Sequence, residues 1–172
     1  NHRGQLGLGD ETDRTTPTLV TRDVVAVAAG SRHSLFVKRD GTLWAMGGNV
    51  DGELGLGDHG LLAHVITPTQ VQGVTDVVAV AAGSQHSLFV KRDGTLLAMG
   101  NNYYGQLGLG DHGDLKERDT PEQVTRDVLA VAGGVYHSLF VKRDGTLWAM
   151  GGNGLGQLGL GDRKSTRLNS SH

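Results

Sequence analysis

The sequence predicts an all-β protein, a β-propeller of four-stranded antiparallel blades, and three observations lead to this fold class. An eleven-residue segment, His-Ser-Leu-Phe-Val-Lys-Arg-Asp-Gly-Thr-Leu, occurs three times without change, at 33–43, 86–96 and 137–147. The short apolar runs around it are typical of strands, and none has a helical period. Gly accounts for 28 of the 172 residues, as expected for many tight turns. Such repetition indicates a structural module that packs against copies of itself.

A glycine-rich segment, Asn-x-x-Gly-Gln/Glu-Leu-Gly-Leu-Gly-Asp, divides the chain into repeats. Its copies begin at Asn1, Asn49, Asn102 and Asn153, so that successive copies are 48, 53 and 51 residues apart. Residues 1–162 therefore contain three repeats and the opening of a fourth. Because the pattern starts and stops inside a repeat, we expect the chain to be a piece of a longer protein.

Each repeat contains four strand-like runs, which in the first repeat lie at 16–20, 24–29, 34–39 and 42–46. The first run contains a Pro, which favours an edge strand, and its counterparts are 67–71 and 120–124. The second run consists of Val and Ala, which indicates a strand covered on both faces, and its counterparts are 77–82 and 128–132. We expect the four runs to form one antiparallel meander in the order of the sequence.

The Asp-Gly pair between the third and fourth runs predicts a hairpin, because both residue types tolerate positive φ. The glycines of the three copies, Gly41, Gly94 and Gly145, are therefore predicted to be structural. Apolar residues occupy both faces of the predicted sheets, so each sheet needs another sheet against each face. Radial stacking provides this, which favours a propeller. A straight β-solenoid is the alternative, although its repeats are usually shorter.

Three motifs together resemble the regulator of chromosome condensation repeat: Gly-x-x-His-Ser-Leu, Asp-Gly-Thr-Leu-Trp-Ala and Gly-x-Asn-x-x-Gly-Gln-Leu-Gly-x-Gly. The resemblance covers residues 1–162 and implies a propeller that usually has seven blades, of which about three would be present here. Where the family typically has Trp before Gly-x-Asn, this chain has Met46, Met99 and Met150, which preserves bulk. The repeats are similar to those of bacterial, repeat-rich members, which are often surface-associated.

The last ten residues, 163–172, have no counterpart after the earlier repeats. They match, codon for codon, the translation of a common sequencing-library adapter, so we expect a non-native tail; a natural polar tail is the alternative. Without this segment the chain has 13 basic and 18 acidic residues, a net charge of −5. An acidic body disfavours direct binding of nucleic acid. The chain has no Cys and no apolar run long enough to span a membrane.

Several motifs have a functional and a structural interpretation, and the structural one is favoured for each. His33, His86 and His137 occur once per repeat and could meet around a metal, but we expect each to hold its turn by bonding backbone. The Gly-x-Gly-x-x-Gly segments at 55–60 and 108–113 precede no crossover helix, as a dinucleotide site would require, so we expect loops. We predict no catalytic residue, no metal and no cofactor.

The copies differ at a few positions against an otherwise identical background. The residue before the repeated His is Arg32, Gln85 or Tyr136, and the pair after the repeated Asn includes Tyr103 and Tyr104. A constant scaffold with variable loops is typical of a binding surface, although unconstrained drift is the alternative. We predict that these five residues bind a partner, with the tyrosines as anchors.

The sequence therefore predicts a non-enzymatic protein-interaction scaffold that binds an unidentified protein partner. The family resemblance implies two alternatives, a guanine-nucleotide exchange factor for a small GTPase and a propeller-type enzyme inhibitor. The similarity to bacterial members favours an extracellular or cell-surface location, whereas an exchange factor would be cytoplasmic or nuclear. An isolated arc of three blades has two uncovered sheet faces, so we expect it to self-associate through them.

Overall fold

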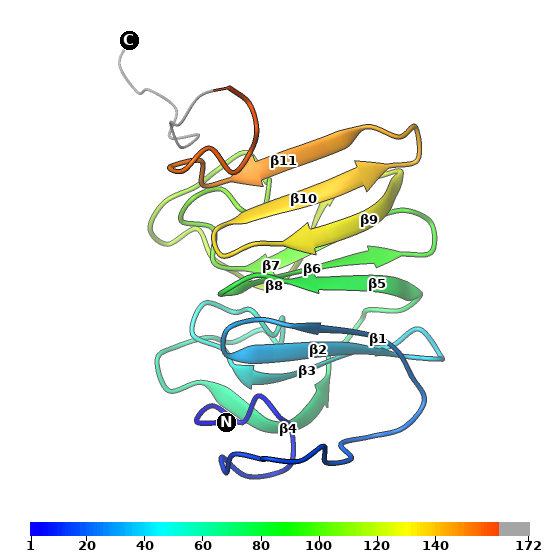
Figure 1. The fold of residues 1–172 in the computed structure, drawn as a ribbon, viewed down its shortest axis with the longest axis vertical. Coiled ribbons are helices and arrows are strands. Elements are labelled where there is room, and N and C mark those ends of the chain that lie inside the picture. The colour runs from blue at the N-terminus through cyan, green and yellow to red at the C-terminus, as the bar shows by residue number, and fades with distance from the viewer. Residues whose placement is uncertain (162–172) are drawn as a thin grey trace.

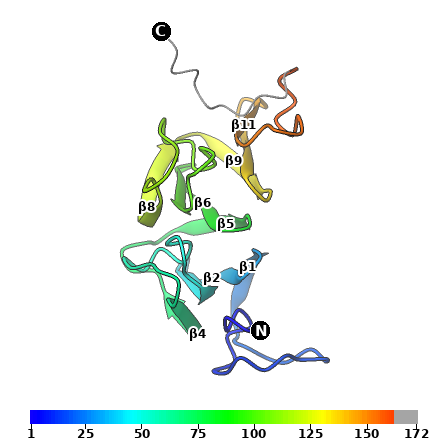
Figure 2. The same cartoon turned by 90° about the vertical axis from the view of Figure 1, so that its left-hand side faces the viewer.

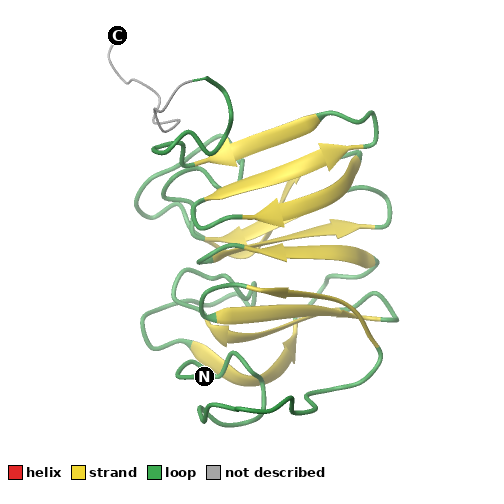
Figure 3. Cartoon of the chain, viewed as in Figure 1, coloured by secondary structure: helices red, strands yellow, loops and turns green. Residues whose placement is uncertain are grey.

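The computed structural model describes residues 1–161 as three antiparallel sheets, here called blades 1 to 3, joined by loops (Figures 1 and 3). Blade 1 consists of β1 (Val24–Ala29), β2 (His33–Lys38), β3 (Leu43–Gly48) and β4 (His64–Gln70). Blade 2 consists of β5 (Val77–Ala82), β6 (His86–Lys91), β7 (Leu96–Gly100) and β8 (Arg118–Thr125). Blade 3 consists of β9 (Val128–Gly133), β10 (His137–Lys142) and β11 (Leu147–Gly151). The predicted all-β class is confirmed. The predicted non-native tail, 163–172, lies outside the described residues.

The strand that contains the Thr-Pro pair is the last of its blade. β4 pairs with β3, with Ala45 opposite Thr69, and β8 pairs with β7, with Ala98 opposite Glu122. The sequence-based order placed this run first in its repeat, which was wrong, whereas its position at a sheet edge is confirmed. The corresponding run 16–20 forms no strand, and residues 1–15 contain no run of the β3 type that could pair with it.

The Asp-Gly hairpins form as predicted, but the two residues have different roles. Only the glycine adopts positive φ, with a value of 83° at Gly41. A Cβ there would lie 3.0 Å from the backbone nitrogen of Asp76, so the hairpin tip of blade 1 also passes close to the start of blade 2. Asp40 instead accepts hydrogen bonds from the backbone N–H and the hydroxyl of Thr42. The aspartate thus stabilises the turn through its side chain.

The blades lie side by side in an arc, with β1, β5 and β9 toward one side and β4 and β8 toward the other (Figure 2). Two apolar clusters fill the spaces between blade 1 and blade 2 and between blade 2 and blade 3. Both faces of β6 are covered as predicted, since the adjacent side chains Leu88 and Phe89 are fully buried. The same coverage, predicted for the Val-Ala strands, is wrong at one position in each of them, since Val25, Val78 and Leu129 are exposed. Val27 on β1 is exposed as well, because residues 1–161 place no blade on that side of blade 1.

Candidate functional site

The positions that vary between repeats meet in pairs at one end of the blades. Arg32, Gln85 and Tyr136 directly precede β2, β6 and β10. Each of them lies beside a residue of the glycine-rich loop that packs against the same blade. This loop residue is the second one after the repeated Asn. The three pairs are Arg3–Arg32 on blade 1, Asp51–Gln85 on blade 2 and Tyr104–Tyr136 on blade 3. We call this set the variable-pair row.

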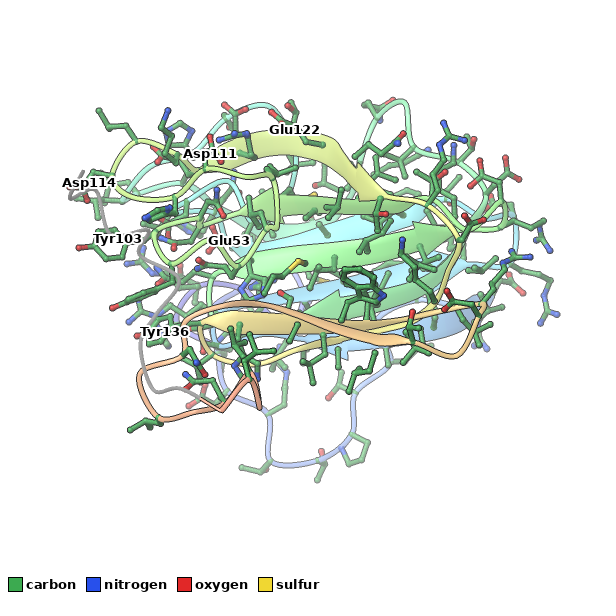
Figure 4. The ribbon with its side chains drawn as sticks, turned by 90° about the horizontal axis from the view of Figure 1, so that it is seen from above. Glu53, Tyr103, Asp111, Asp114, Glu122 and Tyr136 are labelled. Carbon is green, nitrogen blue, oxygen red and sulfur yellow. The ribbon has the colours of Figure 1, made fainter. Side chains whose placement is uncertain are left out.

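Blade 3 presents an aromatic cluster of Tyr103, Tyr104 and Tyr136. The ring centroids of Tyr104 and Tyr136 are 5.0 Å apart, and the ring of Tyr103 meets that of Tyr104 edge-on at 4.9 Å. These are favourable geometries for aromatic pairs. Tyr136 is 44% exposed, and Figure 4 shows Tyr103 and Tyr136 at the same end of the blades. The structure thus brings together all three predicted anchors, although Tyr136 follows Tyr104 by 32 residues in the same repeat.

Blade 2 presents a pair whose polar groups are satisfied within the protein. The Asp51 carboxylate accepts a hydrogen bond of 2.6 Å from Gln85 Nε2 and one of 3.2 Å from Asn101 Nδ2. Burial raises the pKa of Asp51 above its usual value. Gln85 is therefore engaged with its neighbour, so the centre of the row consists of side chains that hydrogen-bond one another.

Blade 1 presents two arginines on either side of Gly48. A Cβ on Gly48 would lie 3.4 Å from Arg32 Cβ and 3.8 Å from Arg3 Cγ, which places the two side chains next to each other. Arg3 Nη1 donates to the backbone oxygen of Leu61 at 3.2 Å. Neither guanidinium forms an ion pair with another of residues 1–161. Arg118, by contrast, bonds two carboxylates at 2.8 Å.

A Gln or Glu side chain stabilises each loop of the row, and it is buried in two of the three loops, as Glu53 and Gln106. Its side-chain oxygen accepts the backbone N–H of the residue two positions earlier, at 3.1 Å for Gln5, 2.8 Å for Glu53 and 2.9 Å for Gln106. Glu53 is 1% exposed, and burial raises its pKa to about 7. Sequence analysis noted that this position is Gln or Glu but missed its role. The available signal was a single Glu, Glu53, where the other three copies have Gln.

Two of the three repeated histidines, His33 and His86, join neighbouring blades. His33 Nε2 lies 2.9 Å from the hydroxyl of Ser87 on blade 2, and this hydroxyl donates to the backbone oxygen of Glu53 at 2.7 Å. His86 makes the equivalent contact with Ser138 on blade 3 at 2.9 Å. The rings thus bond serines of the next blade rather than backbone of their own turns. Because the serine donates its proton to a carbonyl, the histidine must donate from Nε2.

These histidines are neutral and inaccessible. Burial lowers the pKa of His33 to about 4 and that of His86 to about 3. The Nδ1 atom of each ring is buried without a hydrogen-bond partner, so no carboxylate orients the imidazole as it does in a Ser-His-Asp arrangement. Within residues 1–161, no group of three His, Cys, Asp or Glu side chains is arranged to hold a metal ion.

The glycine-rich segments are loops, as predicted. The segment at 55–60 leads into β4 rather than into a helix. Asn49 braces its loop, because its Nδ2 donates to the backbone oxygen of Asp58 at 2.7 Å and its Oδ1 accepts the N–H of Leu54 at 3.0 Å. In the part of the chain that the structure describes, no helix is long and apolar enough to cross a bilayer.

Known proteins share both the repeats and the fold. Ultraviolet-B receptor UVR8 of Arabidopsis thaliana is 34% identical over 169 residues, which cover 92% of this chain and 37% of the receptor. The human regulator of chromosome condensation is 34% identical over 163 residues, covering 91% of this chain and 38% of the relative. The chain thus spans less than two fifths of the length of either protein. Bacterial origin stays a prediction.

Solved structures match the arc of blades. Prp20p of Saccharomyces cerevisiae, which binds Gsp1p and histones, superposes with a TM-score of 0.72 at 25% identity, over 83% of this chain and 36% of Prp20p. Human WBSCR16 gives a TM-score of 0.70 at 26% identity, over 88% of this chain and 40% of that protein. A further structure shows Kap60 bound to the yeast protein. Relatives with this fold therefore bind other proteins.

The repeat signature itself matches most of the chain. One description of the regulator of chromosome condensation repeat matches residues 1–37, 40–90 and 93–141, and a second matches 24–53, 77–106 and 128–157. These matches overlap the three blades and the loops of the variable-pair row. The chain belongs to the regulator of chromosome condensation (RCC1) repeat family.

Proposed function

We propose that this chain is a non-catalytic protein-binding module that contacts its partner through the variable-pair row. The observation that supports this function is the pairwise convergence of the variable positions on one end of an otherwise repeated scaffold. The two members of each pair lie about 30 residues apart in the same repeat, yet they meet at one surface. The binding of Gsp1p and histones by Prp20p, which has the same fold, also supports it.

The row offers a partner two kinds of contact, one on each side of the central Asp51–Gln85 pair, whose side chains bond each other. The tyrosine cluster provides large amphipathic rings that lose little conformational entropy on binding. Arg3 and Arg32 form no ion pair with another of residues 1–161, so an acidic group of the partner could pair with them. We therefore propose a partner surface with an apolar pocket opposite Tyr136 and a carboxylate opposite the arginines.

Photo-crosslinking from the row tests this proposal. A benzophenone side chain at Tyr136 should crosslink a partner from the source cells, whereas the same group at Asp144, on the opposite hairpin tip, should not. The double variant Tyr104→Ala/Tyr136→Ala should weaken binding of the captured partner by at least about tenfold, as removal of aromatic anchors usually does. Equal binding by the double variant and the original chain would contradict the proposal.

Guanine-nucleotide exchange is the second candidate function, and the 34% identity to the human regulator of chromosome condensation favours it. Release of a fluorescent guanine nucleotide from small GTPases, measured with and without this chain, tests it. Acceleration that disappears in the Tyr104→Ala/Tyr136→Ala variant would rank exchange above simple binding. Enzyme inhibition is a further form of the same proposal, and the captured partner's activity with and without the chain would identify it.

A further inference from the structure

Glu53 is an acidic residue in a place built for a neutral one. The other three copies of the loop have glutamine here, and Gln5, Gln106 and Gln157 all accept the same backbone N–H that Glu53 accepts. The Glu53 side chain is 1% exposed and forms no ion pair among residues 1–161. A buried carboxylate without a cation is costly, so this position favours the protonated acid.

The surroundings of Glu53 act on its pKa in both directions. Burial raises the pKa most, the backbone N–H groups of Glu53 and Asp51 lower it by bonding the carboxylate, and the Asp51 charge raises it by a smaller amount, so that the net pKa is about 7. Glu117 and Asp119, at the start of β8, approach the same loop. The Glu117 carboxylate lies 3.6 Å from His59 Nε2, and the Asp119 carboxylate lies 3.4 Å from His59 Nδ1. From blade 1, His33 faces Glu53 through Ser87, and burial keeps this ring neutral by lowering its pKa to about 4.

Glu53 also holds the centre of the variable-pair row. Its Oε2 accepts the N–H of Asp51 at 2.8 Å, and Asp51 in turn bonds Gln85 and Asn101. Its backbone oxygen accepts the Ser87 hydroxyl, which fixes the loop to blade 2. A charged Glu53 can therefore reach water only if the loop moves, and that movement would separate Asp51 from Gln85.

We propose that Glu53 makes the centre of the variable-pair row sensitive to pH, so that the loop at 49–57 is ordered while the carboxyl is protonated and opens more readily when it ionises. This regulation rests on the proposed function, because it concerns the same binding surface. A partner that binds the ordered row would bind more tightly below about pH 7 than above it, since protons and partner favour the same state.

Carbon-13 NMR of the glutamate carboxyl groups tests the proposal without any partner. The resonance absent from the Glu53→Gln variant identifies Glu53, and the other glutamate resonances of the same spectrum serve as internal controls. We expect Glu53 to titrate near pH 7. A Glu53 midpoint below pH 5 would overturn the proposal and leave the proposed function untouched.

Hydrogen exchange of the Asp51 amide measures the opening itself. The ratio of its exchange rates in the original chain and in Glu53→Gln cancels the intrinsic effect of pH on exchange. If the carboxyl has its ordinary pKa of 4.5 in the open loop and about 7 in the closed one, this ratio should rise roughly tenfold between pH 6 and pH 8. A constant ratio would show that ionisation does not open the loop, which would also overturn the proposal.

Discussion

Blades 2 and 3 contain the same eleven-residue segment but place it in different surroundings. Leu96 on blade 2 is fully buried, whereas the equivalent Leu147 on blade 3 is 67% exposed. Leu88 is likewise buried, and its counterpart Leu139 is only half-buried. The strands themselves are nearly identical in register, since both pair leucine with alanine across the hairpin. The sequence of a blade therefore determines the pairing of its strands, whereas the neighbouring blades determine how deeply its side chains are buried.

The physical reason is that a blade has no core of its own. The apolar side chains of β6 and β7 that face blade 3 are covered by Val131, Phe140 and Met150 of that blade. The same face of blade 3 has no such cover in residues 1–161. Stability in such repeats therefore depends largely on contacts between neighbours.

The largest expected difference comes from truncating the same leucine in both blades. Leu96→Ala should lower the free energy of unfolding by about 2–5 kcal/mol, because it removes buried surface and leaves a cavity. Leu147→Ala should cost less than about 1 kcal/mol, because the side chain is already in water. Urea denaturation of both variants measures the two values. Similar losses would mean that the face of blade 3 is covered in solution.

Acid should weaken the contacts between blades through His33 and His86. Their pKa values of about 4 and about 3 lie below the value near 6.5 expected in the unfolded chain, so their stabilisation is complete above pH 6.5. It is lost as pH falls toward these values, at up to about 1.4 kcal/mol per pH unit for each histidine. His86→Gln should therefore flatten the fall in stability between pH 6.5 and pH 4, measured by denaturation at each pH. The exposed His2→Gln is the control, and an equal slope in both variants would contradict the role of burial.

Removing a serine hydroxyl should lower stability more where the hydroxyl also bonds a histidine of the neighbouring blade than where it bonds a backbone carbonyl alone. Ser138→Ala leaves both His86 Nε2 and the Gln106 carbonyl unpaired in a buried place, which should cost about 2 kcal/mol. The hydroxyl of Ser34 bonds only the Gln5 carbonyl, so Ser34→Ala should cost about 1 kcal/mol or less. Thermal unfolding of the two variants compares these losses, and equal values would show that the His–Ser contact adds nothing.

A charge on the exposed face of blade 3 should have the smallest effect on folding but a clear effect on self-association of the chain. Leu147→Glu should reduce self-association of the chain, because it places a carboxylate on the face that a second molecule would cover. The matched variant Leu61→Glu, at a loop position that is also exposed, should leave association unchanged. Sedimentation velocity over a range of concentrations measures both. A monodisperse monomer for the original chain would contradict the predicted self-association.

Much of the fold could be predicted from local pattern. The runs at 24–29 and 77–82 are strands with those bounds, and the Asp-Gly hairpins form where expected. The place of the Thr-Pro strand could not be predicted, because a run between two apolar runs can pair with either. Propensity describes the strand but does not select its partner.

The candidate site was predictable as a set of positions but not as pairs. Arg32, Gln85 and Tyr136 stand out because they vary, yet their partners Arg3, Asp51 and Tyr104 lie about 30 residues earlier in the chain. Contacts across such separations arise from the stacking of blades. The importance of Glu53 was hidden for a similar reason, since Glu and Gln have the same shape and only burial separates their energies.

By itself, the sequence determined the repeated strands, their hairpins and the positions at which the surface varies, because these depend on neighbours along the chain. The tertiary structure alone decided which blade is buried, which serines His33 and His86 meet, and that the Glu53 carboxyl is buried at the centre of the variable-pair row. These depend on surfaces brought together by radial stacking. Identical segments can therefore differ in burial within one molecule.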